Sequence, residues 1–269
     1  MRQKWNALLS LLKKYDGVLV AFSGGCDSTF LAAARRTLGK ERLLAVTAVS
    51  ASFPVTEKQD VEHLSTQLDI EHLFMSTDEM QNPNYAANPP NRCYFCKDEL
   101  FAKLAPIAHS RAMVVVDGFN ASDRAEDRPG FQASLRWNVR HPLNDVGLTK
   151  PEIRVLSRWL KLPTWNKPAS PCLSSRIPFG TAVTADNLNQ VERAEEILKA
   201  ENFQVVRVRH HGALARIEVP LRDLPRLQDP GRWTRIVASL QHIGYRHVEA
   251  DPRGFKSGRL SEEIPSKIH

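Results

Sequence analysis

Apolar residues in the first half of the chain come in short, nearly continuous runs, and segments of helical composition follow them. The runs cover residues 17–22, 42–49, 72–74 and 113–119. Helices are predicted at residues 29–39, 56–68, 92–109 and 149–160. Strands that are apolar at successive positions are buried on both faces, as in a parallel sheet covered by helices. The pattern therefore predicts an α/β domain with a parallel sheet, with loops at residues 82–91 and 120–147.

The pattern changes after a connector rich in proline. A long amphipathic helix is predicted at 184–200, and two strands at 203–211 and 213–219 flank Gly212 as a hairpin. A helix at 233–242 and a strand at 245–250 complete a smaller α+β unit. We therefore divide the chain into a first domain at 1–165, a connector at 166–182 and a second domain at 183–269.

Composition narrows the classes of protein that fit. Of 269 residues, 42% are apolar and 25% charged, as expected of a folded protein, and the net charge of +7 suits an anionic ligand. No apolar run reaches the roughly 18 residues that cross a bilayer, and the first ten residues lack a signal-peptide pattern. Four cysteines do not make a disulfide scaffold in a chain of this length. The expected location is the cytoplasm, without a membrane partner.

A glycine-rich turn, SGGCDS at residues 23–28, stands between the first predicted strand and its helix. Glycines let the backbone approach an anion, and a helix start presents N–H groups that have no partner within the helix. The turn lacks the ending of a Walker loop and the third glycine of a dinucleotide fingerprint. Gly118 follows the fourth strand, at the sheet edge where open α/β sheets bind ligands.

The turn resembles the PP-loop of the ATP pyrophosphatase superfamily, whose pattern is SGGxDS, so Cys26 fills the variable position. The resemblance implies that ATP is cleaved between its α and β phosphates and that the substrate is adenylated. It assigns the pyrophosphate portion to Ser23, Gly24, Gly25 and Ser28. Asp27 is then expected near Mg²⁺ at the helix start.

Four further stretches resemble the LarE family of sulfur transferases in nickel-pincer cofactor synthesis. They are NRCYFCK at 91–97, GFNASDRAEDRPG at 118–130, KPASPCLSSRIPFG at 167–180 and VRVRHHGALARIEV at 206–219. The resemblance implies adenylation of a carboxylate of pyridinium-3,5-biscarboxylic acid mononucleotide, after which sulfur displaces AMP to leave a thiocarboxylate. It also implies a homo-oligomer, and it assigns Asp127 and Arg128 to the region over the bound substrate.

Cys93 and Cys96 lie three residues apart at the start of a predicted helix, on one face and within reach of one metal or cluster. A redox pair, a zinc site completed by His109 or His141, and inert cysteines are the alternatives. The resemblance adds Cys172 as the residue of sulfur chemistry, and the three cysteines together resemble the family branch that holds a [4Fe-4S] cluster. Some other members use the cysteine matching Cys172 as a sacrificial sulfur donor.

Arg207, Arg209 and His211 alternate along a predicted strand and therefore project from one face. Such a cationic stripe suits a phosphate or carboxylate, which arginine binds through two hydrogen bonds. The resemblance favours the two arginines as substrate ligands. Arg176, beside Cys172, is a further candidate for a thiolate or an adenylate phosphate.

Two other functions compete with this interpretation. A PP-loop enzyme of tRNA thiolation would fit the charge, but no RNA-binding module or basic aromatic platform is visible. A regulatory protein that binds nucleotide without cleaving it is the other. The prediction is therefore an ATP-dependent sulfur transferase with a small-molecule partner.

Overall fold

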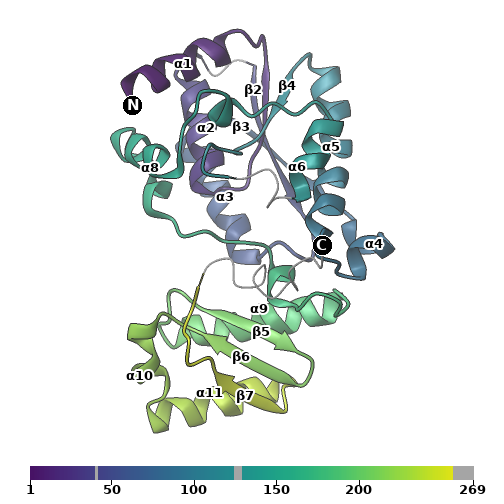
Figure 1. Ribbon diagram of the computed structural model, residues 1–269, viewed down its shortest axis with the longest axis vertical. Helices are drawn as coiled ribbons and strands as arrows, with labels where there is room; N and C mark the ends of the chain where they lie inside the picture. Colours follow the sequence, from purple (N-terminus) through teal and green to yellow (C-terminus); the bar gives the residue numbers. More distant parts are fainter. Residues whose placement is uncertain (40–41, 124–128, 257–269) are drawn as a thin grey trace, which may run out of the picture. The chain divides into compact units, whose positions relative to one another are not determined.

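The computed structural model describes residues 1–39, 42–123 and 129–256 of the chain (Figure 1). The chain folds into two compact units, Met1–Glu79 with Asn91–Ser170, and Met80–Pro90 with Pro171–His269. The connector expected at 166–182 is thus shared between the units. Residues 80–90, assigned to the first domain by sequence, lie with the second unit.

The first unit contains a parallel sheet in the order β3-β2-β1-β4. Its strands are β1 (Val18–Ala21), β2 (Leu43–Val49), β3 (Glu71–Ser76) and β4 (Val114–Val116). Its longer helices are α1 (Arg2–Lys13), α2 (Cys26–Arg36), α3 (Val55–Gln67), α5 (Arg92–Ser110), α6 (Pro129–Arg136) and α8 (Lys150–Trp159). The predicted parallel α/β sheet is confirmed. The segment 120–147, expected to be loop, also contains α6 and the short α7 (Pro142–Asp145).

The two faces of this sheet are covered by different helices (Figure 1). Val18 and Val20 of β1 face a core completed by α1, α2, α3 and α8, whereas Leu19 faces a core completed by α5 and α6. All three side chains are fully buried, as expected of a strand covered on both sides. The helix α1, which the sequence pattern did not predict, contributes Leu8 and Leu12 to the first core.

The second unit has a sheet in the order β5-β6-β7, with β5 (Arg207–His211) antiparallel to β6 (Leu214–Glu218) and β7 (His247–Ala250) parallel to it. The predicted hairpin around Gly212 is present, and Gly212 has a φ of +63°. Helices α9 (Ala185–Ala200) and α11 (Pro230–His242) pack on the buried face with Leu198 and Leu240. The short elements of this unit are α4 (Pro83–Ala86), η3 (Leu173–Arg176), η4 (Leu221–Asp223) and α10 (Leu224–Leu227), whereas η2 (Pro163–Asn166) belongs to the first unit and η1 (Glu79–Gln81) begins at the boundary.

The turn that joins β1 to α2 depends on Gly24. Its φ is +66°, a region that L side chains rarely adopt, and a Cβ there would lie 2.7 Å from Cγ2 of Val61 on α3. Gly147 has nearly the same φ, +68°, but a Cβ there would meet nothing within 4 Å. A substitution at Gly147 therefore introduces backbone strain alone, whereas the same substitution at Gly24 introduces backbone strain and a steric clash.

We expect Gly147→Ala to lower the free energy of unfolding by about 1 kcal/mol through backbone strain alone. Gly24→Ala should cost about 1–3 kcal/mol more, because the added methyl group overlaps Val61. Urea denaturation followed by circular dichroism measures both. The additional Val61→Ala substitution should reduce the extra cost of Gly24→Ala, and equal losses at the two glycines would contradict the steric argument.

Candidate functional site

The glycine turn brings two hydroxyls and the start of α2 together. Ser23 Oγ and Ser28 Oγ lie 3.2 Å apart, and the Ser23 amide donates to Ser28 Oγ at 3.2 Å. Gly25, the residue that precedes α2, has extended backbone and donates to Ser23 Oγ at 3.4 Å. The turn therefore offers hydroxyls and helix-start amides on one short segment, an arrangement that binds anions.

The sheet order places this turn at a switch point. The chain leaves β1 toward β2 on one side and returns to β4 on the other, so the carboxyl ends of β1 and β4 border the crevice where such folds bind ligands. Gly118, two residues after β4, confirms the closeness of the two ends. A Cβ on Gly118 would lie 3.0 Å from Cβ of Asp27 and 3.1 Å from the amide of Ser28.

Cys26 begins α2 but faces the core. It is 4% exposed, and its Sγ lies 3.8 Å from Ser157 Oγ on α8. Burial raises the pKa of its thiol, so the reactive thiolate is disfavoured. Cys26 is accordingly a packing residue beside the turn.

Cys93 and Cys96 occupy the first turn of α5, where Cys93 is exposed and Cys96 half-buried. Neither of the two histidines expected to complete a zinc site is well placed to do so. His109 lies near the other end of α5, about 24 Å from Cys93 along the helix axis at 1.5 Å per residue. His141 is 8% exposed, and both its ring nitrogens contact side chains, Nδ1 with Asp117 at 2.7 Å and Nε2 with Ser134 at 3.0 Å.

Cys172 belongs to the second unit, where it precedes η3 and is half-buried. The side chain of Arg176 holds this loop, since its Nη1 donates to the carbonyls of Pro171 at 2.6 Å and Cys172 at 3.0 Å. Its Nε and Nη2 donate to the two carboxylate oxygens of Glu195 on α9, at 2.8 and 3.0 Å. Arg176 is 2% exposed. These contacts favour a role in positioning Cys172 over the expected direct contact with substrate.

The predicted cationic stripe lies on β5. Val208 and His210 are buried, whereas Arg207, Arg209 and His211 are half-buried on the alternate positions. Arg209 donates to the carbonyl of Ser175 at 2.8 Å and to Glu218 at 2.8 Å. The loop of Cys172 is thus tied to the strand that carries the stripe.

Arg207 is a partly buried cation beside two arginine–glutamate ion pairs, Arg176 with Glu195 and Arg209 with Glu218. Burial, and next the charge of Arg176, lower the pKa of its guanidinium to about 10, so it is still charged at neutral pH. Its guanidinium carbon lies 5.3 Å from the ring centre of Phe255. A bound anion would offset the cost of burying this cation, so Arg207 is a suitable ligand for phosphate or carboxylate.

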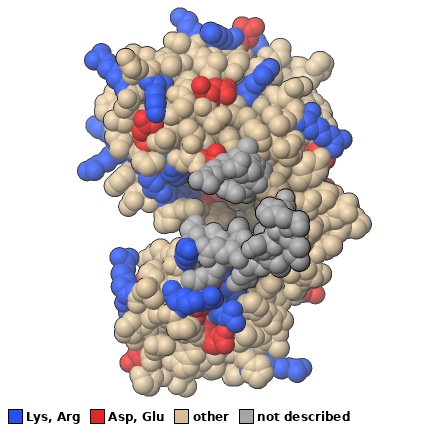
Figure 2. Space-filling model, in the orientation of Figure 1, with Lys and Arg blue, Asp and Glu red and all other residues tan. Residues whose placement is uncertain are grey.

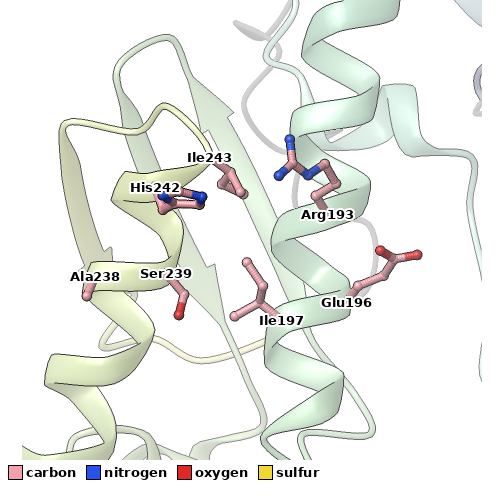
Figure 3. A pocket seen from close by; sticks show the side chains of 7 residues that line it. All are labelled: Arg193, Glu196, Ile197, Ala238, Ser239, His242 and Ile243. Atoms are coloured by element: carbon pink, nitrogen blue, oxygen red, sulfur yellow. The ribbon is translucent and has the colours of Figure 1, made fainter.

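Other surfaces of the described chain carry less chemistry. Between α9 and α11 lies an open groove of about 520 Å³, into which Ile197 extends while Glu196 points away (Figure 3). Lys and Arg side chains are spread over both units on the face in Figure 2, in keeping with the net charge of +7. Within the described residues, no helix has the length and apolar character to cross a membrane.

Two predicted site residues, Asp127 and Arg128, lie outside the described residues. Among the residues that the structure describes, no three His, Cys, Asp or Glu side chains are assembled into a group that could hold a metal ion. What α5 provides is a thiol pair, Cys93 and Cys96, whose sulfur donors suit iron.

Comparison with known proteins gives full-length relatives, although no protein-family model matches the chain. An uncharacterised protein of Synechocystis is 39% identical over 265 residues, 98% of this chain and 99% of its own length. Pyridinium-3,5-bisthiocarboxylic acid mononucleotide synthase of Lactiplantibacillus plantarum is 35% identical over 266 residues, 97% and 95% of the two chains. An uncharacterised protein of Methanocaldococcus jannaschii is 28% identical over 236 residues, 87% and 89%.

Fold and turn together define the class, an α/β protein of PP-loop type with a second α+β unit. The relatives then fix the family. At 35% identity over nearly the whole length of both chains, the protein belongs to the LarE family, that of pyridinium-3,5-bisthiocarboxylic acid mononucleotide synthase. The family expected from the sequence motifs is therefore confirmed.

Glu195 and Glu218 are site residues that the sequence patterns did not reveal. Glu195 is 4% exposed and also accepts the amide of Val208 at 3.2 Å, so it joins η3, α9 and β5. Glu218 is 1% exposed and pairs with Arg209. In the sequence, each glutamate occupies a position typical of the solvent-exposed face of a helix or strand. Only the structure shows that each one is buried and paired with an arginine.

We expect Glu195→Ala to lower the free energy of unfolding by about 3–5 kcal/mol, because it leaves the guanidinium of Arg176 buried without its carboxylate. Glu249→Ala is the matched control in the same unit, since its ion pair with Arg216 is partly exposed and should contribute under about 1 kcal/mol. Urea denaturation of both variants provides the comparison. A loss at Glu195 no larger than at Glu249 would show that the pair does not anchor the Cys172 loop.

Proposed function

We propose that the protein is an ATP-dependent sulfur transferase that converts carboxylates of pyridinium-3,5-biscarboxylic acid mononucleotide into thiocarboxylates for the nickel-pincer cofactor. The observation that carries the proposal is the hydrogen bond from Arg209 to the carbonyl of Ser175, which ties the loop of Cys172 to the strand that carries Arg207 and Arg209, in a full-length relative of the named synthase. A thiol next to an anion-binding stripe suits sulfur transfer to a negatively charged substrate.

The first step is activation of the carboxylate. A carboxylate oxygen attacks the α phosphorus of ATP, the bond to the β phosphate breaks, and pyrophosphate leaves with the bonding electron pair. This step is needed because oxide is a very poor leaving group, whereas AMP leaves readily from the acyl adenylate. Ser23, Gly24, Gly25, Ser28 and Gly118 are the proposed nucleotide-binding residues. Mg²⁺ neutralises phosphate charge when bound, and the carboxylate of Asp27 would hold it.

The second step is attack by sulfur on the acyl carbon, with AMP leaving and carrying away the oxygen of the original carboxylate. The nucleophile must be a thiolate or sulfide. Arg207 and Arg209 are proposed to bind the acidic groups of the substrate, with Asp127 and Arg128 as further contacts from the 118–130 loop. Arg176 contributes by holding Cys172.

The sulfur source has two candidates. In the first, Cys93, Cys96 and Cys172 would hold a [4Fe-4S] cluster, which would supply sulfide for the transfer. In the second, the Cys172 thiolate attacks the acyl adenylate to form a thioester, and elimination then breaks the Cβ–S bond, which leaves thiocarboxylate and dehydroalanine. The presence of the thiol pair on α5 favours the first, because a sacrificial donor requires no second or third cysteine. Full-length similarity to a small-molecule synthase favours this substrate over tRNA.

The reaction is tested anaerobically with ATP, the pyridinium biscarboxylate, a sulfide source and a reductant. We expect AMP, pyrophosphate and thiocarboxylate from the wild type. Cys172→Ala should still release pyrophosphate and form the acyl adenylate but no thiocarboxylate, because activation does not use the thiol, and AMP should appear only as water hydrolyses the adenylate. Cys26→Ala, which removes a buried thiol packed against Ser157, should retain both activities. No AMP and pyrophosphate from the wild type would reject the enzyme and favour a regulatory nucleotide-binding protein.

Iron and sulfide analysis of anaerobically purified protein separates the two sulfur sources. The cluster predicts about four iron and four sulfide per chain, lost in Cys93→Ser and Cys96→Ser. Wild-type activity without iron, together with loss of one H₂S from the protein mass after a single turnover, would instead establish Cys172 as a sacrificial donor.

A further inference from the structure

Two phenylalanine rings stand together in the first unit, and the proposed reaction steps use neither of them. Phe119 lies three residues beyond β4, directly after Gly118, and Phe131 is the third residue of α6. Their ring centres lie 4.8 Å apart, with the ring planes tilted by 34°. Both residues are half-buried, whereas Phe30 in the core of the same unit is 0% exposed. The pair therefore keeps part of its surface open to a ligand.

Two closely packed glycines place these rings between two functional segments. A Cβ on Gly118 would lie 3.0 Å from Cβ of the second residue of α2, so Phe119 begins beside the glycine turn. A Cβ on Gly130 would lie 3.3 Å from the carbonyl oxygen of Cys93, so Phe131 begins beside the first turn of α5. The ring pair thus spans the distance from the turn proposed to bind ATP to the helix start that carries the thiol pair.

A buried polar network holds the rings in place. Oδ1 of Asp117 accepts the amide of Phe119 at 3.0 Å and lies 2.7 Å from Nδ1 of His141. Nε2 of His141 lies 3.0 Å from Oγ of Ser134 on α6. The imidazole ring centre is 5.3 Å from that of Phe119 and 5.2 Å from that of Phe131. The end of β4 and the start of α6 are therefore fixed to each other around the two rings.

The chemistry of the proposed substrate calls for such a pair of rings. Its carboxyl carbons are bonded directly to the pyridinium ring, so a carboxylate that reaches the α phosphate of ATP brings the ring beside the glycine turn. The pyridinium ring carries a positive charge, and the face of a phenylalanine ring attracts a cation through its quadrupole. Phenylalanine also has no polar group that would compete for the carboxylates.

We propose that Phe119 and Phe131 form an aromatic platform that binds the pyridinium ring of the substrate while one carboxylate is presented to ATP. The two residues bind and orient the ring, and no bond forms or breaks on them. Because the platform also adjoins the first turn of α5, the ring keeps its place between activation and the arrival of sulfur. This inference rests on the proposed function, since it assigns the ring-binding part of the same substrate site.

The test compares two forms of the substrate that differ in the charge of the ring. One is pyridinium-3,5-biscarboxylic acid mononucleotide, and the other is its reduced 1,4-dihydropyridine form, which has the same acidic groups on a neutral ring. In calorimetric titration of the full chain without ATP, the wild type should bind the pyridinium form about fivefold or more tightly, as expected of a cation–π contact. Phe119→Leu and Phe131→Leu should each reduce this ratio to less than about twofold, and Phe119→Tyr should keep it.

Trp165→Leu is the matched control. Trp165 lies in η2 of the same unit, is 37% exposed, and has the guanidinium carbon of Arg158 5.1 Å from its ring centre. Its replacement removes an accessible aromatic ring from another place, so the affinity ratio should stay at the wild-type value. The leucine variants should bind Mg²⁺-ATP within about twofold of the wild type, which shows that the glycine turn is still folded.

Equal affinity of the wild type for the two forms would overturn the inference, and so would a ratio that survives in both leucine variants. Should these variants not fold, Phe119→Trp gives a second measurement. An indole against a pyridinium ring produces a charge-transfer absorption band, which the reduced form lacks, and absence of the band would also overturn the inference.

None of these outcomes decides the proposed function, which is judged by release of AMP and pyrophosphate. A wild type that prefers the pyridinium form but releases neither product would reject the proposed function alone. A wild type that binds neither form of the mononucleotide would reject both.

Discussion

The sharp reversal of the backbone at Gly24 is the constraint on which the first unit depends. Because only a residue without a Cβ fits against Val61 with a φ of +66°, β1 can turn directly into α2. That turn sets the direction of the first amides of α2 and places Asp27 and Ser28 against Gly118. A bulkier turn would separate the ends of β1 and β4, and the crevice between them would lose its anion-binding groups.

The second unit has a different constraint, which is the position of the loop that carries Cys172 just before η3. Arg176 fixes this position with a buried ion pair to Glu195 on one side and two loop carbonyls on the other. Buried pairs of this kind are costly to break, and they define one arrangement more strictly than apolar packing would. Arg209 adds a second tie through Ser175. The result is a Cys172 loop held at a defined place and tied to the strand that carries Arg209.

Charge is used differently in the two units. At the glycine turn, Lys150 and Asp27 compensate each other and remain accessible, so a ligand can exchange for either partner. On β5, burial is the main cause that lowers the pKa of the Arg207 guanidinium, and Arg176 and Arg209 beside it are paired with Glu195 and Glu218. The first arrangement suits a ligand that arrives with its own metal ion, and the second suits an anion that arrives alone.

The sequence by itself determined the parallel α/β sheet, the hairpin around Gly212 and the glycine turn, because each depends on local periodicity or on a residue with special backbone freedom. It also singled out Cys93, Cys96 and the arginine stripe from residue type and spacing, and Cys172 from the resemblance to the LarE family. Only the tertiary structure decided that Arg176 serves Glu195 and the Cys172 loop, and that Lys150 meets Asp27. These pairings join residues distant in sequence, and no local pattern encodes which partner a buried or bridging charge will find.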